Sequence, residues 1–175
     1  MFYRALVILL FTIFAATATQ AADDTKYLRG YGKAVWGMTP NEVLKAEKPR
    51  AEKLIKPEKY DSTLAIISIN ELKIGISKFR AIFLFDESGH KLEQVNLNSI
   101  ENDTFTNAST FTSIEKLLTE KYGVPTYKKG NSTVFWKMKH TSIDLQLIDV
   151  PSANISKVVI SYQPSARSQN SARDL

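Results

Sequence analysis

Short stretches in which apolar and polar residues alternate recur along the chain, and they predict β-strands. The clearest is KFRAIFLFD at residues 78–86, which puts three phenylalanines and an alanine on one face and Ile82 and Leu84 on the other. Because both faces are partly apolar, this strand is predicted to be central and covered. Alternation or β-branched composition predicts six strands in all, at residues 63–70, 78–86, 91–100, 132–139, 142–150 and 155–162.

The first predicted helix begins at Thr39, which is a favourable N-cap residue. Pro40 then occupies the first helical position, where its missing N–H costs nothing. Glu42 stands three residues after Thr39 and completes a capping box. The helix is expected to run to about Glu47, because Pro49 prevents its continuation.

The second helix is predicted to begin at Thr112, with Glu115 completing another capping box. Apolar residues at helical spacing follow, and Gly123 is expected to end the helix. Residues 101–110 (ENDTFTNAST) are polar and are interpreted as a connection between the two halves.

A helix followed by three strands therefore occurs twice, which predicts an α+β domain over residues 34–163. Its antiparallel sheet of about six strands would carry both helices on one face. Two interpretations stay open: tandem helix–β–β–β units at residues 34–100 and 111–163, or one domain without internal symmetry. Residues 22–33 are predicted to form an extended leader, and residues 164–175 a disordered tail.

The first 21 residues have the pattern of a signal peptide. Arg4 precedes the apolar run ALVILLFTIFAA at residues 5–16, and small residues follow, so cleavage is expected after Ala21. The apolar run is shorter than the roughly 20 residues that cross a membrane. The chain is therefore expected to be periplasmic or secreted, and the absence of cysteine favours a bacterial periplasm.

Two short motifs carry a resemblance to known proteins. WGMTxxEV at residues 36–43, ahead of antiparallel strands, resembles the helix-opening motif of many small exported bacterial proteins. The helix–strand order is similar to that of the outer-membrane assembly lipoproteins of the SmpA/BamE type and of the tandem repeats of the β-lactamase inhibitor protein fold. LxxxKYGxP at residues 117–125 resembles the helix-to-strand junction of such proteins. The resemblance covers residues 34–163 and implies binding of proteins without catalysis.

The composition narrows the chemistry that the chain can carry. The absence of cysteine excludes disulfide scaffolds, thiol catalysis and metal sites built on thiolates, and only His90 and His140 are left as imidazoles. Both histidines fall in predicted turns. The acidic residues within predicted elements have structural explanations, since Glu42 caps a helix, Asp86 opens a turn and Asp144 points outward from a strand. We therefore assign no catalytic, cofactor-binding or metal-binding residue, and expect a protein that is not an enzyme.

Candidate partner-binding residues follow from strand alternation. The helices have one apolar sheet face to cover and are expected on the side of Trp136, which leaves the opposite face open. Lysines and scattered apolar residues alternate onto that open face, while the polar leader holds two tyrosines without an obvious core. The candidates are Lys137, Lys139, Lys157 and Phe135 on the open face, and Tyr27 and Tyr31 in the leader.

The expected function is that of a non-catalytic, exported protein-interaction or envelope-assembly accessory module. The alternative is a small-ligand-binding or enzyme-inhibitor protein that uses the open face. With 23 basic and 18 acidic residues the formal charge is +5, which suits a protein partner or an anionic envelope polymer. Nucleic acid is not an expected partner, because the lysines are spread along an exported chain. No cofactor is expected, and no transmembrane span after removal of the signal peptide.

Overall fold

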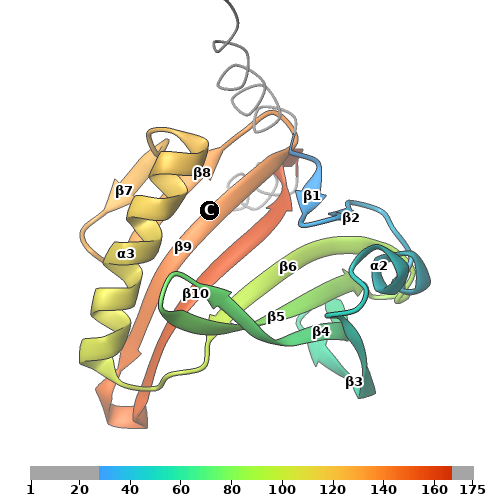
Figure 1. Ribbon diagram of the computed structural model, residues 1–175, viewed down its shortest axis with the longest axis horizontal. Helices are drawn as coiled ribbons and strands as arrows, with labels where there is room; N and C mark the ends of the chain where they lie inside the picture. The colour runs from blue at the N-terminus through green and yellow to red at the C-terminus, as the bar shows by residue number, and fades with distance from the viewer. Residues whose placement is uncertain (1–27, 167–175) are drawn as a thin grey trace, which may run out of the picture.

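The computed structural model describes residues 28–166 (Figure 1). The predicted signal peptide, the first part of the leader including Tyr27, and the tail from residue 167 lie outside the described residues. Among residues 28–166, no helix is long and apolar enough to cross a membrane.

One large antiparallel sheet forms the body of the protein, with the strand order β3-β4-β5-β6-β10-β9-β8-β7. A short hairpin of β1 (Gly30–Tyr31) and β2 (Ala34–Val35) stands apart from it. The eight strands of the large sheet are β3 (Glu52–Tyr60), β4 (Thr63–Ile74), β5 (Ser77–Asp86), β6 (Leu92–Ser99), β7 (Tyr127–Lys129), β8 (Thr133–Lys137), β9 (Thr141–Val150) and β10 (Ile155–Pro164).

The chain runs through the same sequence of elements twice. Helix α2 (Pro40–Ala46) precedes the four strands β3 to β6, and helix α3 (Thr104–Tyr122) precedes the four strands β7 to β10. Each set of four strands is a meander, and the two meanders join through the antiparallel pair β6–β10. The repeated unit in the structure is therefore a helix followed by four strands, where the sequence pattern indicated three.

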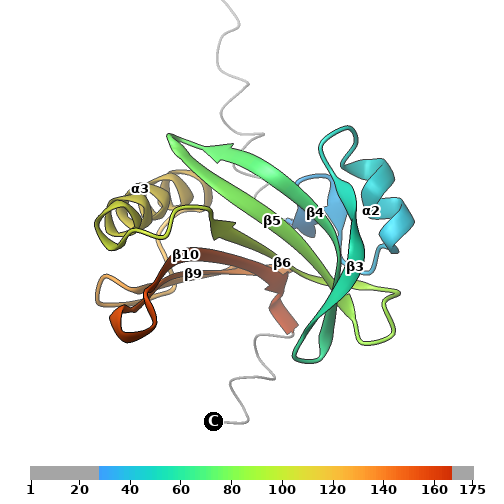
Figure 2. The ribbon, with the colours of Figure 1, turned by 90° about the horizontal axis from the view of Figure 1, so that it is seen from below.

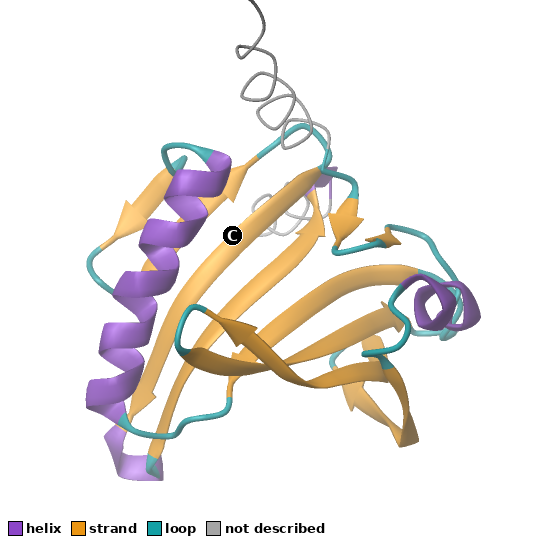
Figure 3. Cartoon of the chain, viewed as in Figure 1, coloured by secondary structure: helices purple, strands orange, loops and turns teal. Residues whose placement is uncertain are grey.

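Both helices pack on the same face of the sheet. Figure 3 shows them at opposite ends of the sheet, and the turned view of Figure 2 shows them on one side of it. One apolar core joins them: Val43 of α2 and Phe111 of α3 belong to the same buried cluster as Phe83 of β5 and Trp136 of β8. This arrangement confirms the α+β class and the expected position of both helices on the Trp136 side.

The sheet has eight strands where about six were expected, because the residue pattern does not reveal its two edge strands. Strand β3 reads EKLIKPEKY, which is mostly charged and contains a proline, and β7 reads YKK with every residue exposed. An edge strand pairs on one side only and has water on the other, so it needs no apolar alternation. Charge and proline at an edge also hinder unwanted pairing with other chains.

Helix α2 begins where the capping box predicted it to begin. Thr39 is the N-cap, its side chain accepts a hydrogen bond from the Glu42 N–H, and the Glu42 carboxylate accepts from the Thr39 N–H at 2.8 Å. The reciprocal bonds satisfy backbone donors that the helix itself cannot pair.

The start of α3 differs from the prediction. The helix begins at Thr104, and its N-cap is Asp103, whose carboxylate accepts from the Thr106 N–H at 2.7 Å. Thr112 lies inside the helix and donates its hydroxyl hydrogen to the Ala108 carbonyl. The first turns hide their helical periodicity because two of their buried positions hold polar residues, Asn107 and Thr110.

The Asn107 amide nitrogen and the Thr110 hydroxyl have hydrogen-bond partners, whereas the Asn107 Oδ1 is buried without one among the described residues. The Asn107 amide donates to the backbone carbonyls of Glu101 and Ser156, at 3.0 and 3.1 Å, and the Thr110 hydroxyl lies 3.0 Å from that of Ser77. Residues that read as a polar connection therefore bind the helix to β5 and β10.

Alanine substitutions at Thr39 and Thr112 test which of these threonines caps a helix. Thr39→Ala is expected to lower the free energy of unfolding by about 1 kcal/mol, since a backbone donor loses its partner. Thr112→Ala should cost nothing measurable, because Thr112 is exposed and alanine has the higher helix propensity. Urea denaturation of both variants measures the difference, and an equal loss in the two would mean that Thr112 does act as a cap.

Candidate functional site

The sheet face that carries neither helix is the candidate binding surface, and we call it the open face. Directly paired residues of antiparallel strands point to the same side, so the register defines the residues that cross this face. One row contains Tyr127, Phe135, Asp144, Ser161, Asn96 and Ile82, from β7 to β5. The neighbouring row contains Lys129, Thr133, Gln146, Val159, Asn98 and Arg80.

Amide, lysine and apolar side chains share the open face. Gln94, Asn96 and Asn98 follow one another along β6, and Lys157 of β10 pairs with Ile148 of β9. Ile148 is 37% exposed, and the neighbouring pair at the end of the β9–β10 hairpin, Val150 and Ile155, is 41% exposed at each residue. The open face thus combines isolated, exposed apolar side chains with amides and cations.

The structure brings together three of the candidate residues. Phe135 and Lys137 alternate onto the open face of β8, and Lys157 lies on the same face of β10. Lys139 lies beyond the end of β8, in the turn to β9, where it lines a hollow of about 390 Å³ with His140 and Trp36. It therefore stands at the margin of the sheet and not in the row of Lys137.

Tyr31 packs inside the molecule, on the face that carries the helices. Its ring centroid lies 4.9 Å from that of Tyr162 and 6.2 Å from that of Phe83. Burial raises the pKa of Tyr31 to about 12, and the nearby Arg50 charge offsets part of that rise. The tyrosine is a packing residue that holds the β1–β2 hairpin against the core, and Tyr27 lies outside the described residues.

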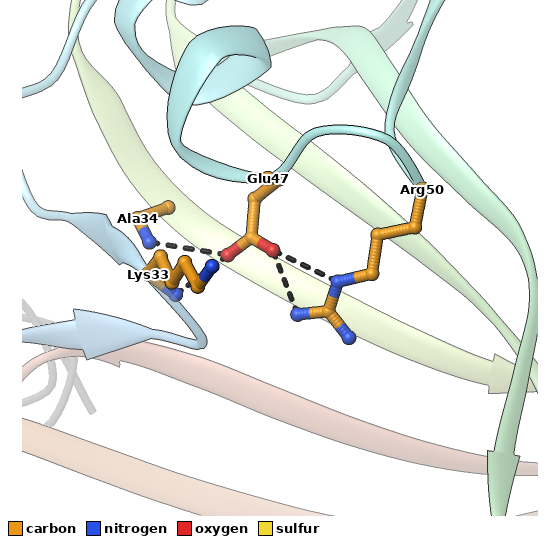
Figure 4. A network of polar contacts seen from close by, with 4 residues as sticks. All are labelled: Lys33, Ala34, Glu47 and Arg50. Carbon is orange, nitrogen blue, oxygen red and sulfur yellow. Dashed lines mark hydrogen bonds and ion pairs between the residues drawn. The ribbon is translucent and has the colours of Figure 1, made fainter.

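A buried carboxylate fixes the same hairpin (Figure 4). Glu47, which follows α2 and is 1% exposed, accepts hydrogen bonds from the backbone N–H groups of Lys33 at 2.7 Å and Ala34 at 3.2 Å. Its other oxygen forms an ion pair with Arg50 at 2.7 Å. The leader and α2 are thereby joined on the helix side, away from the open face.

Asp144 is the acidic group within the row that includes Phe135. Its carboxylate is half-buried and accepts one hydrogen bond, from the Gln146 amide at 2.7 Å, while its Oδ1 is buried without a partner among the described residues. Burial raises the pKa of Asp144, and the bond from Gln146 offsets part of that shift. This position is less outward than strand alternation implied.

Replacing Asp144 by asparagine tests that burial. A carboxyl whose pKa is raised by folding stabilises the protein below its unfolded pKa of about 3.9 and loses that contribution as the pH rises through the folded pKa. Asp144→Asn should therefore unfold at higher denaturant than the parent at neutral pH, and the gap should close on acidification towards pH 4. A variant that is less stable than the parent at neutral pH would contradict this account of the site.

The turn that follows β5 contains His90, one of the two histidines of the chain. His90 is exposed in the β5–β6 turn, where Asp86 accepts hydrogen bonds from the His90 N–H at 2.7 Å and the Ser88 hydroxyl at 2.8 Å. The bond from the His90 backbone lowers the pKa of Asp86 most strongly. Within residues 28–166, no group of three or more His, Asp or Glu side chains could hold a metal ion.

The structure adds residues to the site that the residue pattern did not reveal. Tyr127 and Lys129 belong to β7, and Arg80 faces a large hollow beneath β3, so each depends on an edge strand that shows no alternation. The only available signal was the alternation of Lys78, Arg80, Ile82 and Leu84 along β5, which placed Arg80 opposite the phenylalanines.

Comparison with known proteins yields no relative: no protein-family model, curated protein or solved structure matches this chain. The case for function therefore rests on the geometry and chemistry of the open face.

Proposed function

We propose that this chain is a non-catalytic protein-interaction module that binds a partner protein through its open face. The observation that carries the proposal is that both described helices pack on one face of an eight-stranded sheet, while within residues 28–166 no helix covers the other face. That uncovered face exposes aliphatic and aromatic side chains, including Ile148, Ile155 and Tyr127, among amides and lysines. Such apolar groups can serve as anchors within a polar rim.

Charge favours an acidic partner. The half of the open face formed by β7 to β10 carries Lys129, Lys137 and Lys157 against the single acid Asp144. Complementary charge speeds association and selects the partner more than it adds affinity. Because residues 1–21 have a signal-peptide pattern, we place this role in the periplasm or outside the cell, in envelope assembly or a related process.

The alternative function, an enzyme inhibitor or small-ligand protein, would use the same surface. An inhibitor differs only in that its partner is an enzyme, whereas a ligand carrier would bind metabolites without a protein. Thermal stabilisation by small molecules, in the absence of any protein, would favour the carrier.

Reversing the lysine charges tests the proposal. Lys129→Glu, Lys137→Glu and Lys157→Glu together should leave stability nearly unchanged, because exposed charges contribute little. The matched control reverses three exposed lysines outside the open face, Lys48, Lys91 and Lys116, and changes the net charge equally.

Capture from an envelope extract over a series of salt concentrations then compares the two triple variants with the parent. We expect specific partners to be retained by the parent and the control, and lost from the open-face variant, most clearly at low salt. A partner retained equally by both variants would place the binding surface elsewhere.

A further inference from the structure

Strand β3 arches over one end of the open face. Its pairing with β4 shifts register between Lys53 and Glu58, so residues 54–57 form a bulge without direct partners on β4, and we call this bulged segment the arch. Leu54 turns inward and packs on Ala65, Ile82 and Leu84, a small apolar cluster on the open face. Residues 52–58 enclose, with Asn70 and Arg80, a hollow of about 700 Å³.

The side chain of Arg80 lines this hollow. The side chain is half-buried on β5, and within residues 28–166 it forms no hydrogen bond or ion pair; its Nε is buried without an acceptor. The two acidic residues of the hollow accept hydrogen bonds from groups other than Arg80. Glu52 accepts from the Asn70 amide, and Glu58 accepts from the Tyr60 hydroxyl at 3.2 Å.

The positive charge of Arg80 acts on Tyr60 of β3, which lies near the hollow. Burial and the neighbouring Glu58 raise the pKa of Tyr60, and the Arg80 charge acts in the opposite direction. The buried Nε–H of Arg80 is unfavourable where it stands, because this donor has lost water without gaining a hydrogen bond among the described residues. A planar anion is the group that satisfies it best, through two parallel N–H···O bonds.

We propose that the hollow beneath β3 binds a carboxylate carried by a segment of the partner protein, with Arg80 as the binding residue. The inference rests on the proposed function, and it names the group that the partner inserts. Lys53, Lys56 and Arg80 line the hollow against Glu52 and Glu58, so the lining has one net positive charge, which suits a single carboxylate better than a doubly charged anion such as phosphate.

The position of the hollow suits a chain segment. Arg80 pairs with Asn98 of β6, which pairs with Val159 of β10, so a residue that lines the hollow also lies in a row of the open face. Leu54, Ile55 and Pro57 supply apolar contacts on the arch, and the amides of β6 supply donors and acceptors for a peptide backbone.

Arginine Nε–H signals in proton–nitrogen NMR spectra of the mature chain test the proposal directly. The probe is the capped tripeptide Ac-Ala-Glu-Ala-NH₂, and its uncharged match is Ac-Ala-Gln-Ala-NH₂. We expect the glutamate peptide to shift the Arg80 signal saturably and the glutamine peptide to leave it unchanged. Arg80→Gln should weaken binding of the glutamate peptide at least about tenfold, since charge-assisted hydrogen bonds are lost.

Two further variants separate binding from folding. Arg80→Lys keeps the charge but loses the two-pronged geometry, so its affinity should fall between those of the parent and Arg80→Gln. Arg29→Gln removes an exposed arginine elsewhere and should bind as the parent does. Arg80→Gln is expected to be as stable as the parent or more so, because an unpaired, half-buried charge is removed.

Equal shifts with both peptides, an undiminished shift in Arg80→Gln, or saturation by acetate or inorganic phosphate as tight as by the glutamate peptide would overturn the proposal. These results are independent of the lysine variants. The glutamate peptide could bind at Arg80 while the triple lysine variant still retains every captured partner. That combination would support the carboxylate site and contradict the proposed interface on the rest of the open face.

Discussion

Trp136→Ala is expected to lower the free energy of unfolding by about 4 kcal/mol, the largest effect of any substitution considered for this protein. Trp136 lies on β8, is 1% exposed and packs in the core that joins both helices to the sheet. Its indole N–H also donates to the Gly123 carbonyl at the end of α3, at 3.0 Å. Truncation leaves a cavity and an unpaired carbonyl together.

Trp36→Ala is the matched control for this prediction. Trp36 is half-buried beside the β8–β9 turn, and its indole N–H donates to the Thr141 hydroxyl at 3.0 Å. Because part of its ring already faces a hollow, its loss should cost about 2 kcal/mol, roughly half the effect at Trp136. Chemical denaturation followed by circular dichroism compares the two variants, and equal losses would show that Trp36 is as fully packed as Trp136.

Glu47→Ala is expected to cost about 3 kcal/mol. The Glu47 carboxylate is buried and is the acceptor for the backbone N–H groups of Lys33 and Ala34. Without it, two donors lose their partner, and the Arg50 guanidinium loses its carboxylate. The β1–β2 hairpin should detach from α2 before the sheet unfolds, so amide exchange at residues 30–35 should rise first.

Arg50→Ala separates the contribution of the ion pair from that of the backbone hydrogen bonds. The Arg50 side chain is 42% exposed, so water screens its charge, and its removal should cost about 1 kcal/mol or less. The free energy of unfolding is therefore expected to be clearly lower for Glu47→Ala than for Arg50→Ala. If the two variants were equally unstable, the ion pair and not the backbone amides would hold the hairpin.

These substitutions bear on the function because they act on the covered side of the sheet. Trp136, Tyr31 and Glu47 hold α3, the β1–β2 hairpin and α2 on one face. Variants at Lys129, Lys137, Lys157 and Arg80 change the other face and are expected to leave stability intact. A loss of partner binding without a loss of stability can therefore be assigned to the open face.

The central strands and the first helix were predictable because local signals and burial agree there. On β5, alternation separates the phenylalanines of the main core from Ile82 and Leu84 of the second cluster, as the structure also has them. At α2, the capping box places a strong start signal on a helix that then buries Val43. Fold class and the side that carries the helices follow from those patterns.

The edges of the sheet, the start of α3 and most of the candidate site depended on tertiary structure. Strands β3 and β7 are recognised only by the neighbours that pair with them, since one side of each faces water. Asn107 and Thr110 are buried because β10 and β5 supply hydrogen-bond partners distant in sequence.

Local sequence contains the alternation and the capping signals, because these depend on residues within one or two turns of each other. Local sequence does not indicate which distant strand will cover a given side chain or leave it exposed. Phe135, Lys137 and Lys157 could be assigned to one face from alternation, whereas the hollow that Arg80 lines depends on an arch of β3 that only the assembled sheet creates. The residues of the helix-covered face could therefore be predicted from local sequence, whereas the hollow at Arg80 depends on packing between strands distant in sequence.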